Sequence, residues 1–220
     1  MCPTPPSTQP FAAASPSPSA VWYVSYGSNM DPRRLRSYLE GGCPPGGNAD
    51  HPGARDGTPP ADSAGVTLPG RLYFAGRSRV WGGGGVAFYD HDVAGPTPAR
   101  AFLVTAEQFA DIAAQEMGRT PAPGDPVESA LSDGLPGGRL VLGRGYYETV
   151  LDVGALRGLP MYTFTAAQSC DAVVHTPPST AYLATLAAGL RQAHDWPQDR
   201  IDDYFAEHTT RSRPEDAQGL

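Results

Sequence analysis

Apolar and polar positions follow two different periods along the chain, which predict short strands separated by a few helices. Apolar and alternating runs predict strands at 21–25, 71–78, 85–90, 99–105, 146–153 and 159–166. Helical periods and end signals predict helices at 32–40, 106–117, 180–194 and 198–207. Strands dominate and helices are interspersed, so we expect an α+β domain built on a small mixed β-barrel or curved sheet with flanking helices.

Turn and cap residues sharpen these predictions at three places. Asp31 followed by Pro32 is typical of a helix N-cap and first helical position. Thr105 followed by Gln108 fits a capping box at the start of the second helix. Residues 91–98 are rich in turn formers and lie between two predicted strands, so we expect a β-hairpin there.

Pro- and Gly-rich segments divide the chain. Residues 1–19 are rich in Pro, Ser and Ala, and we expect a disordered tail there. Residues 20–208 are expected to form a single domain, and 209–220 a C-terminal tail. Inside the domain, 42–69 and 119–144 have almost no apolar pattern, which predicts two long loops.

Charge and composition exclude several classes of protein. The net charge is −7 and no basic block is present, which disfavours nucleic-acid binding. All 16 basic residues are Arg, so there is no lysine for a P-loop, a Schiff base or a Ser-x-x-Lys pair. Cys2, Cys43 and Cys170 are widely spaced, which indicates neither a zinc ribbon nor a disulfide framework. Without a signal peptide or a membrane-length apolar run, we expect a cytoplasmic enzyme or binding protein with no membrane partner.

One carboxylate lies where a helix should be apolar. Phe109, Ile112 and Ala113 form an i, i+3, i+4 stripe, and Glu116 falls at i+7 within it. Burial would raise the pKa of Glu116 towards the range that suits a general acid/base. The alternative is a helix-end glutamate that turns to solvent or pairs with Arg119. Glu107, Asp111 and Gln115 are expected on the other face of the helix.

The turn Tyr26-Gly27-Ser28-Asn29 lies between a predicted strand and a predicted helix. Gly27 can adopt a positive φ, and the exposed N–H groups beside a helix start can bind a carboxylate or an oxyanion. The alternative is an ordinary turn with a cap.

Two further patterns leave alternatives open. Asp90, His91 and Asp92 could suggest a metal, but no second ligand group is spaced to match, which favours a polar hairpin turn. The glycines after Trp81 indicate either a close approach of the backbone to another strand or ligand, or a flexible turn.

Taken together, five segments in chain order make the sequence resemble the γ-glutamylcyclotransferase family over residues 21–205. They are YGSN at 26–29, Trp81 with the glycines before Val86-Ala87, ARAFLVTAEQFADIAAQEMG, GYYETVLDV and PPSTAYLATLAAGLRQAHDWP. On this resemblance Glu116 is the catalytic residue, and Tyr147 and Tyr182 are substrate-site tyrosines. Tyr26, Gly27, Ser28 and Asn29 complete the substrate-binding set.

The resemblance implies an enzyme of the lyase or acyltransferase type that needs neither cofactor nor metal. The α-amine of a γ-glutamyl small molecule would attack its own γ-carbonyl, releasing 5-oxoproline and an amine or amino acid, with Glu116 moving the proton. We expect a monomer or homodimer, and the two long loops could reshape the pocket for another substrate. Two alternatives remain, a non-catalytic ligand- or peptide-binding member of the fold and an amide hydrolase that uses Ser28 as nucleophile.

Overall fold

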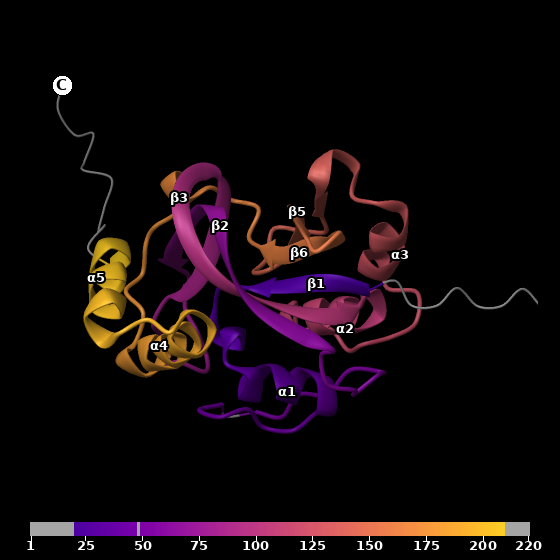
Figure 1. Ribbon diagram of the computed structural model, residues 1–220, viewed down its shortest axis with the longest axis horizontal. Coiled ribbons are helices and arrows are strands. Elements are labelled where there is room, and N and C mark those ends of the chain that lie inside the picture. Colours follow the sequence, from indigo (N-terminus) through magenta and orange to yellow (C-terminus); the bar gives the residue numbers. More distant parts are fainter. Residues whose placement is uncertain (1–19, 48, 210–220) are drawn as a thin grey trace, which may run out of the picture.

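The computed structural model describes residues 20–47 and 49–209 (Figure 1). The expected tail at 1–19 and residues 210–220 of the expected C-terminal tail lie outside the described residues. Thr209, the first residue of that second segment, is the last residue of a helix.

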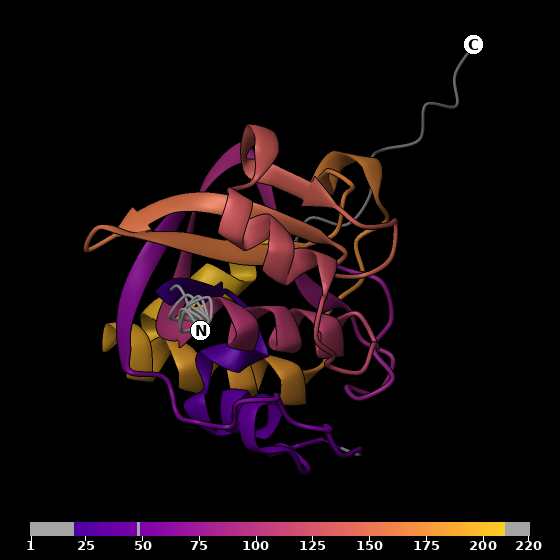
Figure 2. The same cartoon turned by 90° about the vertical axis from the view of Figure 1, so that its right-hand side faces the viewer.

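Six strands form one curved, open sheet in the order β2-β3-β1-β6-β5-β4. β1 pairs in parallel with β6, and the other neighbouring pairs are antiparallel. Figure 2 shows the long β2–β3 pair bending around one side of the molecule. The α+β class and the curved sheet are therefore confirmed, with the sheet left unclosed. The strands are β1 (Ala20–Ser25), β2 (Asp62–Ala75), β3 (Val86–Thr105), β4 (Arg139–Val141), β5 (Thr149–Leu156) and β6 (Leu159–Thr165).

Five α-helices accompany the sheet, and the predicted caps are confirmed. The Asp31 side chain accepts a hydrogen bond from the Arg33 N–H, and Pro32 is the first residue of α1. The Thr105–Gln108 capping box is formed at the start of α2. The helices are α1 (Pro32–Glu40), α2 (Ala106–Glu116), α3 (Pro126–Asp133), α4 (Thr180–His194) and α5 (Gln198–Thr209), with short 3₁₀ turns η1 (Ser28–Met30), η2 (Pro136–Gly138) and η3 (Cys170–Ala172).

The predicted hairpin at 91–98 is wrong, because β3 runs unbroken through it for 20 residues. β3 pairs along its length with β2, which already starts at Asp62 inside the segment predicted as a loop. Register shifts on both sides of Gly70 accommodate the turn-forming residues, as bulges do in bent strands. The second predicted loop is wrong in part as well, since 119–144 contains α3 and β4.

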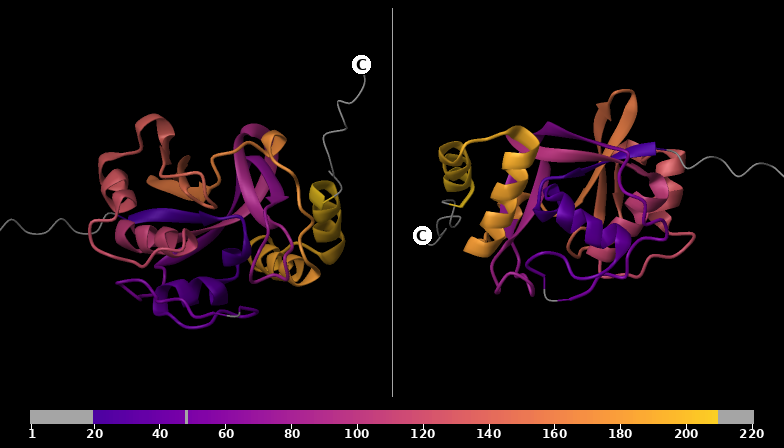
Figure 3. Two further views of the ribbon diagram at one scale, coloured as in Figure 1. Left: turned by 180° about the vertical axis from the view of Figure 1, so that it is seen from behind. Right: turned by 60° about the horizontal axis from the view of Figure 1, so that its bottom comes forward.

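The two faces of the sheet carry separate apolar cores. Trp22 and Tyr23 are neighbours in β1 that point to opposite faces and belong to different clusters. The cluster around Trp22 is closed by α4 and α5, which lie beside β2 and β3, whereas α2 packs beneath β1 in the other (Figure 1). Figure 3 shows α1 and α2 side by side from two further directions. The turn after β1 therefore lies where both layers meet.

Candidate active site

A pocket of about 510 Å³ opens at the end of β1, within the size range of small-molecule sites. Its wall includes residues 23–29, the loop around Trp81, the start of β3 and parts of α1 and β6. The structure brings all the sequence-predicted site residues to this one pocket: Glu116, Tyr26, Gly27, Ser28, Asn29, Tyr147 and Tyr182.

Glu116 enters the pocket from the last residue of α2. Phe109, Ile112 and Ala113 are fully buried, so the helix stripe they form brings the Glu116 carboxylate to the same side. Glu116 Oε1 accepts a hydrogen bond of 2.8 Å from Asn29 Nδ2. The alternative pairing with Arg119 is not formed, since Arg119 pairs with Asp125.

Burial raises the pKa of Glu116 above its usual value of 4.5, because desolvation penalises the charged form. Hydrogen bonds from the Tyr38 hydroxyl and from Asn29 oppose this rise, as does the positive charge of Arg34. The carboxylate faces the pocket and is enclosed by protein on its other sides. A carboxyl group with a raised pKa can both accept and return a proton near neutral pH.

Gly27 does not adopt the positive φ that its sequence position allowed. Its φ is −110°, which is open to other residues. A Cβ there would lie 3.4 Å from the Tyr182 hydroxyl. That hydroxyl accepts a hydrogen bond from the Ala87 N–H at 3.2 Å, and the Ser28 backbone lowers its pKa. Gly27 thus allows Tyr182 to join the turn to β3.

Tyr147 is held in an unusual backbone conformation beside the same strand. Its φ is 60°, which is uncommon for a large side chain and is found at functional sites. The ring stacks on Phe88, and the hydroxyl donates to the Ala87 carbonyl at 3.1 Å. Both polar backbone groups of Ala87 are therefore bound by tyrosines, one by Tyr147 and one by Tyr182. Burial raises the pKa of both phenols, so both hydroxyls stay neutral.

Sequence reasoning missed two pocket residues on α1, Arg34 and Tyr38. Arg34 is 4% exposed, and its guanidinium carbon lies 4.9 Å from the centre of the Trp81 ring. The Tyr38 hydroxyl acts on Glu116 and lowers the pKa of its carboxyl group. Their spacing of four residues puts them on one face of a helix that directly follows the turn, and this was the available signal.

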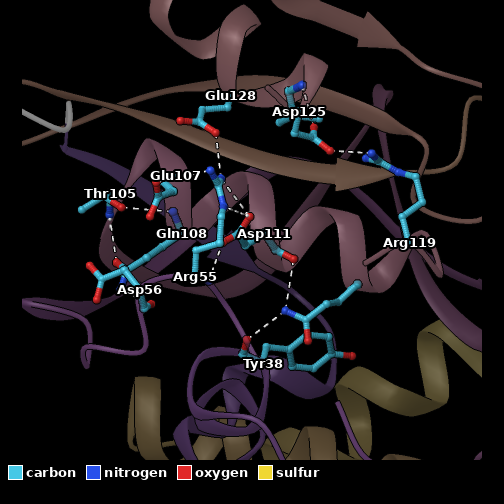
Figure 4. Close-up of polar contacts among 12 residues, drawn as sticks. Tyr38, Arg55, Asp56, Thr105, Glu107, Gln108, Asp111, Arg119, Asp125 and Glu128 are labelled. Carbon is cyan, nitrogen blue, oxygen red and sulfur yellow. Dashed lines mark hydrogen bonds and ion pairs between the residues drawn. The ribbon is translucent and has the colours of Figure 1, made fainter. Parts of the chain in front are cut away.

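The opposite face of α2 is covered by residues 55–58, which bind Asp111 and Gln108 (Figure 4). Arg55 Nε donates to Asp111 at 2.9 Å, and its Nη2 donates to Glu128 at 2.7 Å. Glu107 lies 3.3 Å from Arg55 Nη1. Gln115 donates to the Tyr38 carbonyl at 2.9 Å, which ties α2 to α1. The polar face predicted from the sequence thus fixes the helix that carries Glu116.

Two other sequence patterns have structural roles. Asp90, His91 and Asp92 lie in β3, so the hairpin-turn interpretation is wrong. The Asp90 carboxylate accepts from the Ser169 hydroxyl and the Cys170 N–H, and we assign no metal to this group.

Both interpretations of the glycines after Trp81 hold in part: Gly82 and Gly83 have a positive φ with open space around them, whereas Gly84 and Gly85 approach residues 176–179 closely. A Cβ on Gly85 would lie 2.1 Å from the Thr176 carbonyl oxygen, and one on Gly84 would lie 2.6 Å from the Ser179 nitrogen. The Gly85 N–H donates to the Pro177 carbonyl.

The Ser28 hydroxyl has no histidine beside it in the pocket. Among the described residues that line the pocket none is a histidine, and His51 stacks instead on Tyr38 with ring centres 3.9 Å apart. A serine nucleophile activated by histidine is therefore not assembled by these residues.

Comparison with known proteins identifies the fold. No protein-family model matches the chain. The sequence is 31% identical over 203 residues, 84% of this chain, to histone deacetylase 5 of Arabidopsis thaliana, and the match spans 30% of that protein. A solved γ-glutamyl cyclotransferase covers 92% of this chain and 93% of its own, with a TM-score of 0.50 and 14% identity. An uncharacterized protein from Homo sapiens covers the same shares, with a TM-score of 0.49 and 15% identity.

The chain thus has the γ-glutamyl cyclotransferase fold, as the sequence resemblance predicted. In the part of the chain that the structure describes, every helix is too short or too polar to cross a membrane.

Proposed function

We propose that this protein is a γ-glutamyl cyclotransferase that converts a γ-glutamyl compound to 5-oxoproline and a free amine or amino acid. One observation carries the proposal. Glu116 enters a pocket of small-molecule size and is held by Asn29 of the turn that lines the same pocket. The shared fold with a γ-glutamyl cyclotransferase supports it.

The reaction is an intramolecular attack, so holding the substrate folded supplies much of the rate. The α-nitrogen forms a bond to the γ-carbonyl carbon, and the bond from that carbon to the leaving nitrogen then breaks. Well-oriented groups in one molecule reach effective molarities of about 10⁵–10⁸ M. Backbone N–H groups of the 26–29 turn would stabilise the negative charge on the carbonyl oxygen.

Glu116 would accept two protons in turn from the α-nitrogen, which changes from an ammonium to the lactam N–H, and deliver both to the leaving nitrogen, which departs as an ammonium, so the proton balance closes without another group. Asn29 Oδ1 is buried and has no hydrogen-bond partner among the described residues. It can accept a hydrogen bond from the substrate ammonium while Asn29 Nδ2 holds Glu116. Tyr147 and Tyr182, both bound to Ala87, would shape the wall against which the substrate folds.

The test is release of 5-oxoproline from a panel of γ-glutamyl amino acids, amines and peptides. We expect Glu116→Gln to lower turnover by about 10²–10⁴-fold on the preferred substrate, because it removes the general acid/base. Glu107→Gln is the matched control, since Glu107 lies on the same helix and outside the pocket. Full activity of Glu116→Gln, with its circular dichroism spectrum unchanged, would remove Glu116 from the mechanism.

A further inference from the structure

Arg34 is a buried cation with no carboxylate in direct contact among the described residues. It is 4% exposed, and within residues 20–47 and 49–209 it forms no ion pair. Its Nη1 donates to the Pro45 carbonyl at 2.7 Å, and its Nε is buried with no acceptor among the described residues. Burying a charge is costly unless it is paired and hydrogen-bonded. Asp31 and Glu116 act on Arg34 only from beyond ion-pair distance, so the guanidinium lacks a directly bound carboxylate.

The charged residues around Arg34 indicate that the missing partner belongs in the pocket. Arg34 lines the pocket together with Arg77 and Arg79, whereas Glu116 is the one carboxylate among the described lining residues. Glu116 is already bound by Asn29. The wall thus carries the buried Arg34 and the exposed Arg77 against one carboxylate, which favours an anionic ligand.

Trp81 holds the guanidinium in a defined orientation. The ring packs on the guanidinium at 4.9 Å, a cation–π distance. This contact uses no N–H group of the guanidinium, so the groups other than the Nη1–H bound to Pro45 stay available for hydrogen bonds. The planar edge of the guanidinium matches a carboxylate, which can accept two N–H groups at once.

We propose that Arg34 binds a carboxylate of the ligand and makes this pocket select anionic ligands over neutral analogues. The inference rests on the proposed function for the identity of the ligand, because every γ-glutamyl compound carries an α-carboxylate. When the leaving amine is an amino acid, a second carboxylate lies on the leaving side.

The first experiment measures binding by calorimetry and needs no turnover. 5-Oxoproline and its neutral amide, 5-oxoprolinamide, are titrated into the wild type, Arg34→Gln and Arg36→Gln. Arg36 is a matched control on the same helix, exposed and outside the pocket. We expect the wild type and Arg36→Gln to prefer the carboxylate by about 10- to 100-fold. In Arg34→Gln the preference is expected to disappear while affinity for the amide is kept.

The second experiment distinguishes the two carboxylates. KM is compared for γ-glutamyl-alanine and γ-glutamyl-ethylamine, which differ by the carboxylate on the leaving side. An Arg34→Gln effect confined to γ-glutamyl-alanine assigns Arg34 to the leaving group, and an effect on both assigns it to the glutamyl group. Arg34→Lys keeps the charge but loses the planar edge, so it should retain part of the preference.

The proposal is overturned if the wild type shows no preference for the charged ligands. Preferences in both experiments that persist in a folded Arg34→Gln overturn it as well. Charge-dependent binding without any release of 5-oxoproline would contradict the proposed function and leave the Arg34 site standing. An active enzyme with unchanged preferences in Arg34→Gln would contradict only the Arg34 site.

Discussion

Arg34 is buried and Arg55 is partly buried, and the two arginines differ in what surrounds them. Arg55, 20% exposed, lies between Glu107, Asp111 and Glu128, whose negative charges raise its pKa. Arg34, 4% exposed, faces a pocket and stacks on an aromatic ring. A buried cation whose charge is balanced within the protein has a structural role, whereas one left unbalanced beside a pocket indicates a ligand. Arg55 therefore belongs to the structural contacts on one side of α2, and Arg34 belongs to the candidate site on the other side.

The largest expected difference is in stability. Arg55→Met leaves Asp111, which is 0% exposed, without its cation, and should lower the free energy of unfolding by about 3–5 kcal/mol. Arg34→Met leaves no carboxylate unpaired, so its cost should be much smaller or its effect stabilising. Urea denaturation of both variants measures the difference. Equal losses of unfolding free energy in the two variants would contradict this contrast, because Arg34 would then have a structural role too.

Glu116 provides a pH-dependent test on the pocket side of α2. The folded-state pKa of Glu116 is raised, so its favourable contribution to stability is complete below about pH 4.5 and is lost as pH rises through the folded value. At pH 7 we expect Glu116→Gln to unfold at a higher temperature than the wild type, and the gap should close below pH 4.5. Asp111→Asn should instead be less stable at pH 7, because Asp111 pairs with Arg55. A melting series from pH 4 to pH 8 tests both, and a Glu116→Gln variant less stable at pH 7 contradicts the expectation.

The smallest expected effect concerns the support of Glu116. Tyr38→Phe removes a hydroxyl that lowers the pKa of Glu116, so that pKa rises further and the acid limb of the pH–rate profile moves to higher pH. Turnover on that limb should fall by about two- to tenfold. Tyr162→Phe is the control, because Tyr162 is buried outside the pocket. If the acid limb of the pH–rate profile does not shift in Tyr38→Phe, Tyr38 does not influence the pKa of Glu116.

Local signals in the sequence predicted the helix caps and the position of Glu116. The Asp31 and Thr105 caps depend on contacts within three residues, and the stripe ending at Glu116 depends on one helix. The turn-forming residues at 91–98 led to a wrong prediction, because pairing with β2 outweighs their preference for turns. Register shifts accommodate these residues within the strand.

The partners of the site could not be predicted in the same way. Asn29 meets Glu116 across 87 positions and Arg55 meets Asp111 across 56, and no periodicity encodes such distances. The charge balance of Arg34 likewise depends on which carboxylates the fold brings near it. The family resemblance predicted Tyr147 and Tyr182 as site tyrosines, but only the structure shows that both hydrogen-bond the backbone of Ala87.

The hydrogen bonds between these tyrosines and the Ala87 backbone have a consequence for amide hydrogen exchange. The Ala87 amide hydrogen is donated to the Tyr182 hydroxyl, so it can exchange with solvent only when that side chain moves away. Its exchange rate therefore reports the opening of the pocket wall itself, at a single backbone position. A ligand that holds Tyr182 against the turn would slow exchange at Ala87, which makes this one amide a built-in sensor of occupancy.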